Sequence, residues 1–261
     1  MIKIISYPVS SFGRVILQCV KDLGRYVIFL GLNARNITHV GRRIHLIFER
    51  MQKVGVESIP LIAITSAFTG MVTAVQATYQ TGGILPYRYL GAMITKSTMI
   101  ELAPVLTALV MAGKIGASLA AELGTMRVTD QIDALEVLAI NPYDYLILPR
   151  IIAGVVMLPI LTIFANVFGI LSGFVVSTSL YHVTTTEFLM GIRMFFAPVD
   201  FWSGIVKSVL FGLIITSIGC FQGFYAQGGA EGVGKVTTRA VVISSILILI
   251  TDFFVAAVIF G

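Results

Sequence analysis

Residues 101–142 read ELAPVLTALVMAGKIGASLAAELGTMRVTDQIDALEVLAINP, and this stretch decides the fold. Its first part is apolar and rich in small residues, which is typical of a helix that packs closely against other helices in a membrane. Its second part is short, acidic and amphipathic, and it lies between Thr129 and Pro142. Apolar sequence continues on both sides. We therefore expect a charged helix between two spans, where a soluble partner can dock.

The composition of the whole chain places it in a membrane. Of its 261 residues, 57% are hydrophobic and 12% are charged, whereas soluble domains carry about 25% charged residues. Too few charges remain to cover a water-facing surface, so the predicted class is an all-α integral membrane protein. The net charge of +5 does not indicate nucleic-acid binding, because the basic residues form no patch interleaved with aromatic residues.

Five apolar segments are long enough to span a bilayer. They are residues 58–87, 89–123, 150–181, 201–225 and 240–261. In the second segment, the small-residue rows Ala112/Gly116/Ala120 and Gly113/Ala117/Ala121 predict close helix contacts. Between the segments we expect a turn at Gly82-Gly83, a short helix capped by Thr184–Thr186, and a Gly-rich polar loop at 226–239.

The N-terminal residues 1–53 are predicted to form an amphipathic segment in the membrane interface, ahead of a transmembrane bundle at 54–261 within one domain. One face would carry Ile16, Val20, Leu23, Val27 and Leu30, and the opposite face Arg14, Gln18, Lys21 and Arg25. The start lacks the order of a cleaved signal peptide, so we expect a mature N-terminus. Cys19 and Cys220 have no CxxC partner, which predicts neither a disulfide nor a metal framework.

The distribution of Lys and Arg predicts the topology. Nine of the 18 lie in residues 1–53. With the N-terminus inside, inner segments hold fourteen of them and outer segments four, which favours a cytoplasmic N-terminus and an external C-terminus. The chain shows no internal repeat, so a symmetric pathway would need two copies of it.

The acidic segment has the features of a docking helix. Thr129 is a good N-cap, and Asp130, Asp133 and Glu136 suit the positive end of a helix dipole. Ile132, Leu135 and Ala139 would share one face, and Asn141-Pro142 would end the helix. The alternative is a loop helix lying on the membrane, but an acidic helix gains nothing from an anionic surface.

The same region resembles the MlaE/YrbE family of ABC-transporter permeases, which serve phospholipid and related lipid traffic. The family pattern is roughly E-L-G-P-V, G-R-x-G-A, A-E-L-G-T-M and T-E-Q-I-D-A-L-E. It stands here as residues 101–105, 113–117, 121–126 and 129–136, and a second match is Gly228–Val241. The likeness covers about residues 50–261. Ala103, Lys114 and Asp130 replace the usual Gly, Arg and Glu, and Ile100 stands where some members carry Arg.

This resemblance implies a non-catalytic permease in a bacterial inner membrane. Residues 129–140 would be a cytoplasmic coupling helix that contacts a separate ATPase subunit, which would bind ATP and Mg²⁺. The permease would be a homodimer with an MCE-domain lipid-binding protein on its outer side. The resemblance assigns coupling to Thr129, Asp130, Gln131, Asp133, Leu135 and Glu136.

Three ionisable residues lie inside predicted spans, where charge is costly unless it is paired or hydrated. We hypothesise that Glu101 and Lys207 lie near each other and near a lipid headgroup; the alternative is a structural ion pair, or a lysine that reaches the surface. Asp252 is expected to be a buried polar group bonded to a neighbouring helix. Gln76 and Tyr79 are expected to line the outer cavity, with interface anchoring by Tyr79 as an equal alternative.

A channel or secondary transporter and a membrane enzyme are the two alternatives to lipid transport. A stand-alone channel or secondary transporter could use Glu101, Lys207 and Asp252 as an ion path. A membrane enzyme would need a nucleophile, base or metal set, and none is recognisable from spacing. The stretch 229–236 matches G-x-x-x-x-G-K, but Val236 stands where a P-loop needs Ser or Thr. We therefore predict no catalytic or metal residues and no cofactor of the chain's own.

Overall fold

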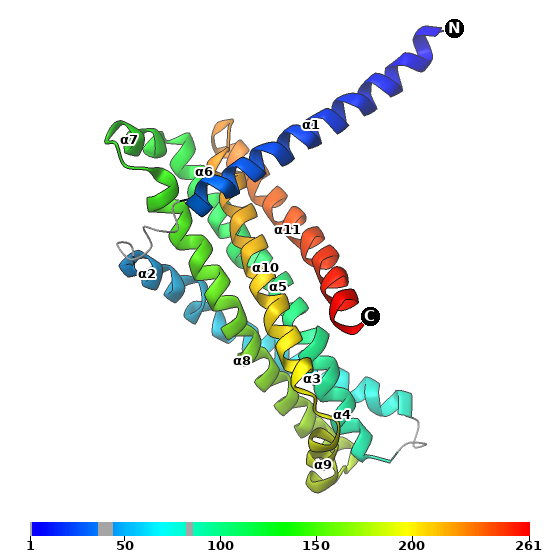
Figure 1. Ribbon diagram of the computed structural model, residues 1–261. Helices are drawn as coiled ribbons and strands as arrows, with labels where there is room; N and C mark the ends of the chain where they lie inside the picture. Colours follow the sequence, from blue (N-terminus) through cyan, green and yellow to red (C-terminus); the bar gives the residue numbers. More distant parts are fainter. Residues whose placement is uncertain (1, 36–43, 82–85) are drawn as a thin grey trace.

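The structure is a computed structural model that describes residues 2–35, 44–81 and 86–261, with side chains in these ranges except at 2–16, 18 and 19. Throughout this described part every regular element is a helix (Figure 1). Five helical stretches have the length and composition of membrane spans. They are Ile44–Thr81, Arg88–Val128, Tyr143–Tyr181, Pro198–Phe224 and Gly229–Phe260. The predicted all-α membrane fold with five spans is confirmed.

The helices follow one another along the chain with short connections. The first is α1 (Ile2–Arg35). The spans contain α2 (Ile44–Val54) with α3 (Ile59–Thr81), then α4 (Arg88–Ser97), α5 (Ala103–Met111) and α6 (Ala117–Val128), then α8 (Leu148–Tyr181), α10 (Pro198–Phe224) and α11 (Gly229–Phe260). The short helices α7 (Gln131–Val137) and α9 (Thr185–Phe195) lie at opposite ends of the bundle (Figure 1), which we call the α7 end and the α9 end.

Close backbone contacts hold the spans together. A Cβ added to Gly70 would stand 1.9 Å from the carbonyl oxygen of Gly169, so only glycine fits at this point of the contact between α3 and α8. A Cβ on Gly219 would stand 2.9 Å from the carbonyl oxygen of Gly116, which joins α10 to the second span. The small-residue row Ala112/Gly116/Ala120 is buried, as predicted. The parallel row that begins at Gly113 faces outward instead, since a Cβ on Gly113 would meet nothing within 4 Å.

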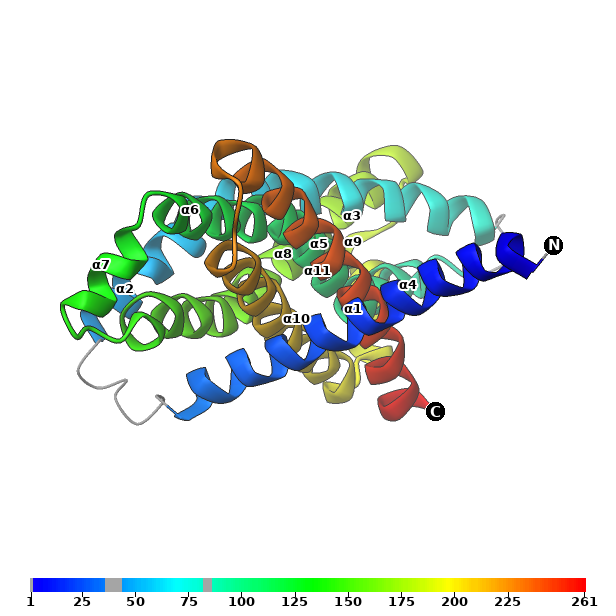
Figure 2. The ribbon, with the colours of Figure 1, turned by 90° about the horizontal axis from the view of Figure 1, so that it is seen from above.

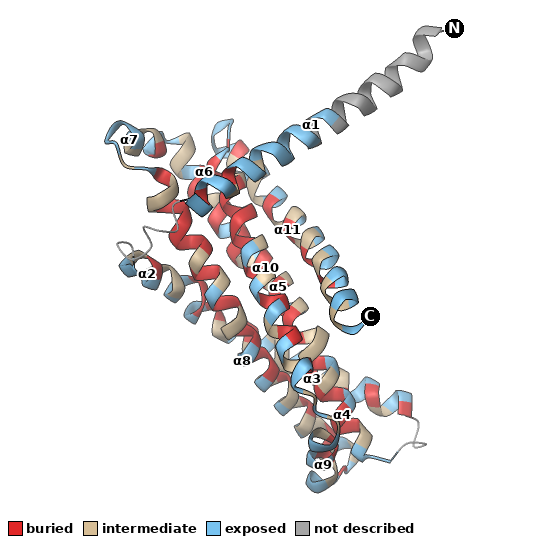
Figure 3. Cartoon of the chain, in the orientation of Figure 1, coloured by how far each residue is buried: buried red, intermediate tan, exposed pale blue. Residues whose placement is uncertain are grey.

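The N-terminal helix α1 crosses the α7 end above α10 (Figure 2). Phe29 is fully buried against Tyr143, Phe221 and Phe224, which anchors the C-terminal part of α1 on the bundle. The other described side chains of α1 are mostly exposed (Figure 3). Val20, Leu23 and Val27 are among the exposed residues. The side chain of Ile16 is not described, and Arg42 and Arg43 beyond α1 lie outside the described residues.

The predicted N-terminal segment is divided into two helices, because α2 forms the last part of it. Ile47 and Val54 of α2 are buried, while Glu49 and Lys53 are half exposed. The chain bends at Gly55 before α3, and the hydroxyl of Ser58 donates to the carbonyl of Val54 there. The predicted boundary at 53/54 therefore falls at the end of α2.

The helices α9 and α11 begin within two predicted polar connections. Thr184 caps α9 in a capping box with Glu187, so the predicted short helix is confirmed. The predicted loop at 226–239 is wrong, because α11 already begins at Gly229, after left-handed Gly228 (φ +91°). Helix formation is possible because Gly232 packs directly on the carbonyl of Gln227, where a Cβ would stand 1.8 Å away. Gly82-Gly83 lies outside the described residues.

Candidate functional site

The second span is widened by two π-helical turns, Thr98–Leu102 and Ala112–Gly116, which contain Glu101 and Lys114. The first lies just before Pro104, whose ring nitrogen cannot donate the hydrogen bond that a regular helix needs. Such π-helical turns occur frequently at functional sites. The second span therefore carries an ionisable side chain at each of its two π-helical turns.

A three-residue ion network lies at the first of these turns. Lys207 of α10 places its Nζ 2.5 Å from Oε2 of Glu101 and 2.7 Å from Oδ1 of Asp252 on α11. The Lys207 side chain is fully buried, whereas Glu101 is 45% exposed. The expected Glu101–Lys207 proximity is thus present. Asp252 is buried and bonded to a neighbouring helix, as expected, and its partner is the same lysine. One buried cation therefore joins three helices.

Beside this network is a cavity of about 720 Å³ between α3 and the start of the second span. Glu101 and Gln76 both line it, together with Lys96, whose Nζ lies 3.1 Å from Oδ2 of buried Asp200. Tyr79 does not line it and is 86% exposed, which fits the alternative of interface anchoring. The remaining polar lining residues are Thr69, Thr73, Gln80 and Ser97.

Sequence reasoning missed most of this polar lining, although the signal was present. Residues 69, 73, 76 and 80 of α3 are Thr, Thr, Gln and Gln, and their spacing of three or four residues places them on one helix face. A polar stripe inside an apolar span indicates a face directed at a cavity or a partner rather than at lipid chains.

At the other end, α7 forms a short projection between α6 and α8 (Figure 1). The prediction of Thr129 as its N-cap is wrong: the Thr129 hydroxyl donates to the carbonyl of Thr125, and Asp130 occupies the N-cap position with a left-handed φ of 56°. The chain reverses sharply here, and Asp tolerates that conformation better than β-branched Thr. The helix also ends before Asn141-Pro142, because left-handed Ala139 (φ 57°) stops it.

The predicted coupling residues have different environments. Asp130, Gln131 and Glu136 are exposed, whereas Asp133 forms an ion pair with Arg127, and Leu135 packs on the core. Ile132 is fully buried, which fixes α7 to the bundle. Ala139 is exposed, so it does not share the buried face that was predicted for it.

Two exposed apolar residues at the tip of α7 were not predicted. Val137 is 87% exposed and Leu138 is 69% exposed. They follow Glu136 and lie away from the face that carries Ile132 and Leu135. An apolar tip beside the Glu136 carboxylate has the composition of a small protein interface, in which apolar anchors lie within a polar rim. We call Glu136, Val137 and Leu138 the α7 tip.

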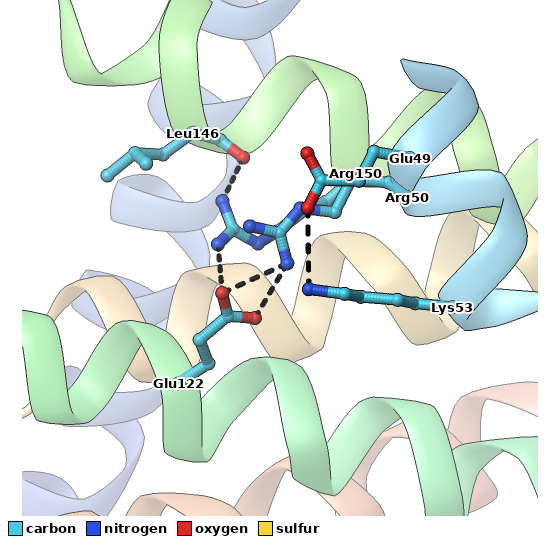
Figure 4. Close-up of polar contacts among 6 residues, drawn as sticks. All are labelled: Glu49, Arg50, Lys53, Glu122, Leu146 and Arg150. Atoms are coloured by element: carbon cyan, nitrogen blue, oxygen red, sulfur yellow. Dashed lines mark hydrogen bonds and ion pairs between the residues drawn. The ribbon is translucent and has the colours of Figure 1, made fainter. Parts of the chain in front are cut away.

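An ion cluster ties the base of α7 together (Figure 4). Glu122 of α6 accepts hydrogen bonds from Arg50 of α2 at 2.9 Å and from Arg150 of α8 at 2.7 Å. Arg150 is 1% exposed and also donates to the carbonyl of Leu146. Since α6 precedes α7 and α8 follows it, the cluster fixes both ends of the projection to each other and to α2. We call Arg50, Glu122 and Arg150 the clamp.

Comparisons with known proteins point in the same direction as this geometry. A family model described as "Permease MlaE" matches residues 47–258. A probable ABC transporter permease protein of Synechocystis is 44% identical over 212 residues, which are 81% of each chain. A probable ABC transporter permease protein of Rickettsia felis is 35% identical over 251 residues, or 96% of this chain and 97% of that one. The intermembrane phospholipid transport system permease protein MlaE of Haemophilus influenzae is 31% identical over 97% of both chains.

Proposed function

Because the chain belongs to the MlaE family of ABC transporter permeases, we propose that it moves phospholipids or related lipids between membranes, driven by a separate ATPase subunit. The observation that carries this proposal is α7. It projects from one end of the bundle with an exposed apolar tip, and the clamp joins its base to α2, α6 and α8. A lever built in this way passes motion of a bound partner into the spans.

The cavity beside Glu101 supports a lipid as the transported substrate. Its wall combines polar groups from Gln76, Lys96 and Glu101 with apolar side chains such as Phe68 and Val72. A lipid headgroup suits the polar part and acyl chains suit the apolar part. Lys207 is fully buried and lies between two carboxylates, so a stand-alone ion path through Glu101, Lys207 and Asp252 has no support from the structure.

The orientation follows from the charge distribution. Lys and Arg are concentrated in residues 1–53 and near α7, which supports a cytosolic position for the α7 end and the N-terminus in a bacterial inner membrane. The cavity then faces the outer side, where an MCE-domain lipid-binding protein would receive or deliver the lipid. ATP and Mg²⁺ would bind to the ATPase alone, and this chain would perform no catalysis.

A homodimer is part of the proposal. Large apolar side chains are exposed along α3 and α11, among them Phe68, Val72, Phe253 and Phe254. Phe68 and Val72 of α3 also line the cavity. A second copy packed against α3 would add to the cavity wall.

Introducing charge at the apolar residues of the α7 tip tests the coupling. Val137→Asp with Leu138→Asp should reduce copurification of the ATPase subunit by about tenfold or more, because apolar anchors at an interface centre dominate its affinity. The measurement is the ratio of ATPase to permease after affinity purification in detergent. Glu136→Lys should add to the effect. Asp133→Lys is less informative, because it also breaks the ion pair with Arg127.

A control change at the opposite end is Met190→Asp on α9, where Met190 is 59% exposed. It introduces a single carboxylate at an exposed apolar residue and should leave the ratio unchanged. An α7-tip variant that retains a normal ATPase ratio would refute the assignment of α7 as the coupling helix.

A further inference from the structure

A second, smaller cavity of about 150 Å³ lies between α2 and the second span, closer to the α7 end. Three cations line it: Arg50 and Lys53 from α2, and Lys114 from the second π-helical turn. Two carboxylates, Glu57 and Glu122, also line it. This small cavity shares no lining residue with the large cavity beside Glu101.

The charges around this cavity do not cancel. Glu122 is already bonded to two arginines, Arg50 and Arg150. Lys114 donates to the carbonyl of Glu57 at 2.7 Å and to the hydroxyl of Ser58 at 3.0 Å, both neutral oxygens. An ammonium group has three N–H donors. In the described part of the chain, these two hydrogen bonds of Lys114 use two of the three donors, and neither acceptor is a carboxylate.

Lys53 is the most accessible of the three cations. It pairs with Glu49 one turn earlier at 3.4 Å, and both side chains are about half exposed. Exposed pairs of this kind contribute little and exchange partners readily. A phosphate entering the cavity would therefore find Lys53 and Lys114 available, with Arg50 behind them.

The surroundings of the cavity suit acyl chains. Val54, Ile115 and Leu119 form its apolar walls. Below it, the outer face of α3 exposes Leu61, Ile64 and Phe68 in succession.

Phe68 on this face also lines the large cavity. A narrow pocket between α3 and α5 adjoins the large cavity, since Thr69 and Leu102 line both. The wall of this pocket is mixed, because Thr65, Ser66 and Thr107 line it together with Leu106 and Ala165.

We infer that the cavity lined by Lys53 and Lys114 binds the phosphate headgroup of an anionic lipid in the leaflet at the α7 end, as a second lipid site separate from the large cavity. Snorkelling lysines at the boundary of the hydrocarbon layer are suited to this contact. The role of this second site rests on the proposed function, because a lipid transporter can use two lipid sites. The binding itself requires neither transport nor an ATPase.

The test is photo-crosslinking in lipid nanodiscs with a phosphatidylglycerol analogue that carries a photoactivatable headgroup, followed by mass spectrometry of the labelled peptides. Wild-type protein should be labelled in α2 and at 112–119, and also around the large cavity. Lys53→Gln with Lys114→Gln should lower the first labelling by about tenfold, since charge-assisted bonds to phosphate are lost. Labelling around the large cavity should persist in this variant.

The matched control is Lys235→Gln. Lys235 is 65% exposed and pairs with Glu231 one turn earlier at 2.7 Å, as Lys53 does with Glu49. It lines neither cavity, so labelling should not change. Lys114→Arg keeps the charge and should retain most of the labelling. Lys53→Gln alone changes a half-exposed side chain and should leave the fold intact. It should still lower the labelling of α2, so the inference can be tested even if Lys114→Gln does not fold.

Four outcomes would overturn the inference. Labelling confined to the large cavity would remove the second site and leave the proposed function intact. Displacement of the label at α2 by millimolar inorganic phosphate would make the site a free-anion site. Equal labelling by a diacylglycerol analogue would show that phosphate is not recognised. Failure of the reagent to label either cavity would contradict both the second site and lipid transport itself.

Discussion

Lys207→Met is expected to destabilise the folded protein by about 3–5 kcal/mol, the usual cost of removing one partner from a buried ion pair. Lys207 is fully buried and is the cation between Glu101 and Asp252. Without it, two carboxylates face each other inside the bundle with no compensating charge. Equilibrium unfolding in mixed detergent micelles would measure the loss. A change below about 1 kcal/mol, the median for exposed ion pairs, would contradict the described network.

The neutral triple variant Glu101→Gln, Lys207→Met and Asp252→Asn separates a structural role from a functional one. Neutralising every member of a buried ion network is often harmless to stability, so we expect most of the lost stability to return. If the charges act on the lipid, transport should remain impaired in this stable variant. Recovery of transport together with stability would show that the network is purely structural.

A charge swap of Glu101 and Lys207 alone is a weaker test. Asp252 would remain as a second carboxylate, and it would lie next to the new glutamate at position 207. Failure of the swap to restore function would therefore not exclude the pair. Only the structure reveals this difficulty, because the contact of Asp252 with Lys207 depends on how α11 is rotated against α10.

The spans were predictable because the apolar segments are long and few charges interrupt them. The Glu101–Lys207 contact was predictable for a related reason: an ionisable side chain in a span must find a partner or water, and few candidates exist. By contrast, α11 begins earlier than predicted. Its glycines read as loop residues in the sequence, but Gly232 is needed for close packing against Gln227.

The clamp could not be predicted from the sequence. Glu122 is separated from Arg50 by 72 positions and from Arg150 by 28. Each of the three residues lies near the end of an apolar segment, where a charge can be satisfied by water and needs no protein partner. Sequence reasoning likewise placed α7 correctly between two spans but misjudged its ends. Both ends depend on left-handed residues, Asp130 and Ala139, that are neither Gly nor Asn.

Substitutions in the clamp are expected to lower stability by very different amounts, depending on which partner is removed. Glu122→Ala should cost about 3–5 kcal/mol of stability, because it leaves the guanidinium of Arg150, 1% exposed, without its carboxylate. Arg50→Gln should cost only about 1 kcal/mol, since Glu122 keeps Arg150 and is itself partly hydrated. Detergent unfolding of the two variants should reproduce this order, and an equal loss in both would contradict the described geometry.

Adding Arg150→Met to Glu122→Ala should restore much of that stability, because the fully buried charge is then removed and the cation left without its partner, Arg50, is 20% exposed. The double variant is the informative one for mechanism. With α6 and α8 no longer joined by ions, the partner ATPase should still bind the α7 tip and hydrolyse ATP, but lipid movement per ATP should fall. Reconstituted complexes can measure both rates. An unchanged ratio of lipid moved to ATP consumed would mean that motion reaches the spans by another route than the clamp.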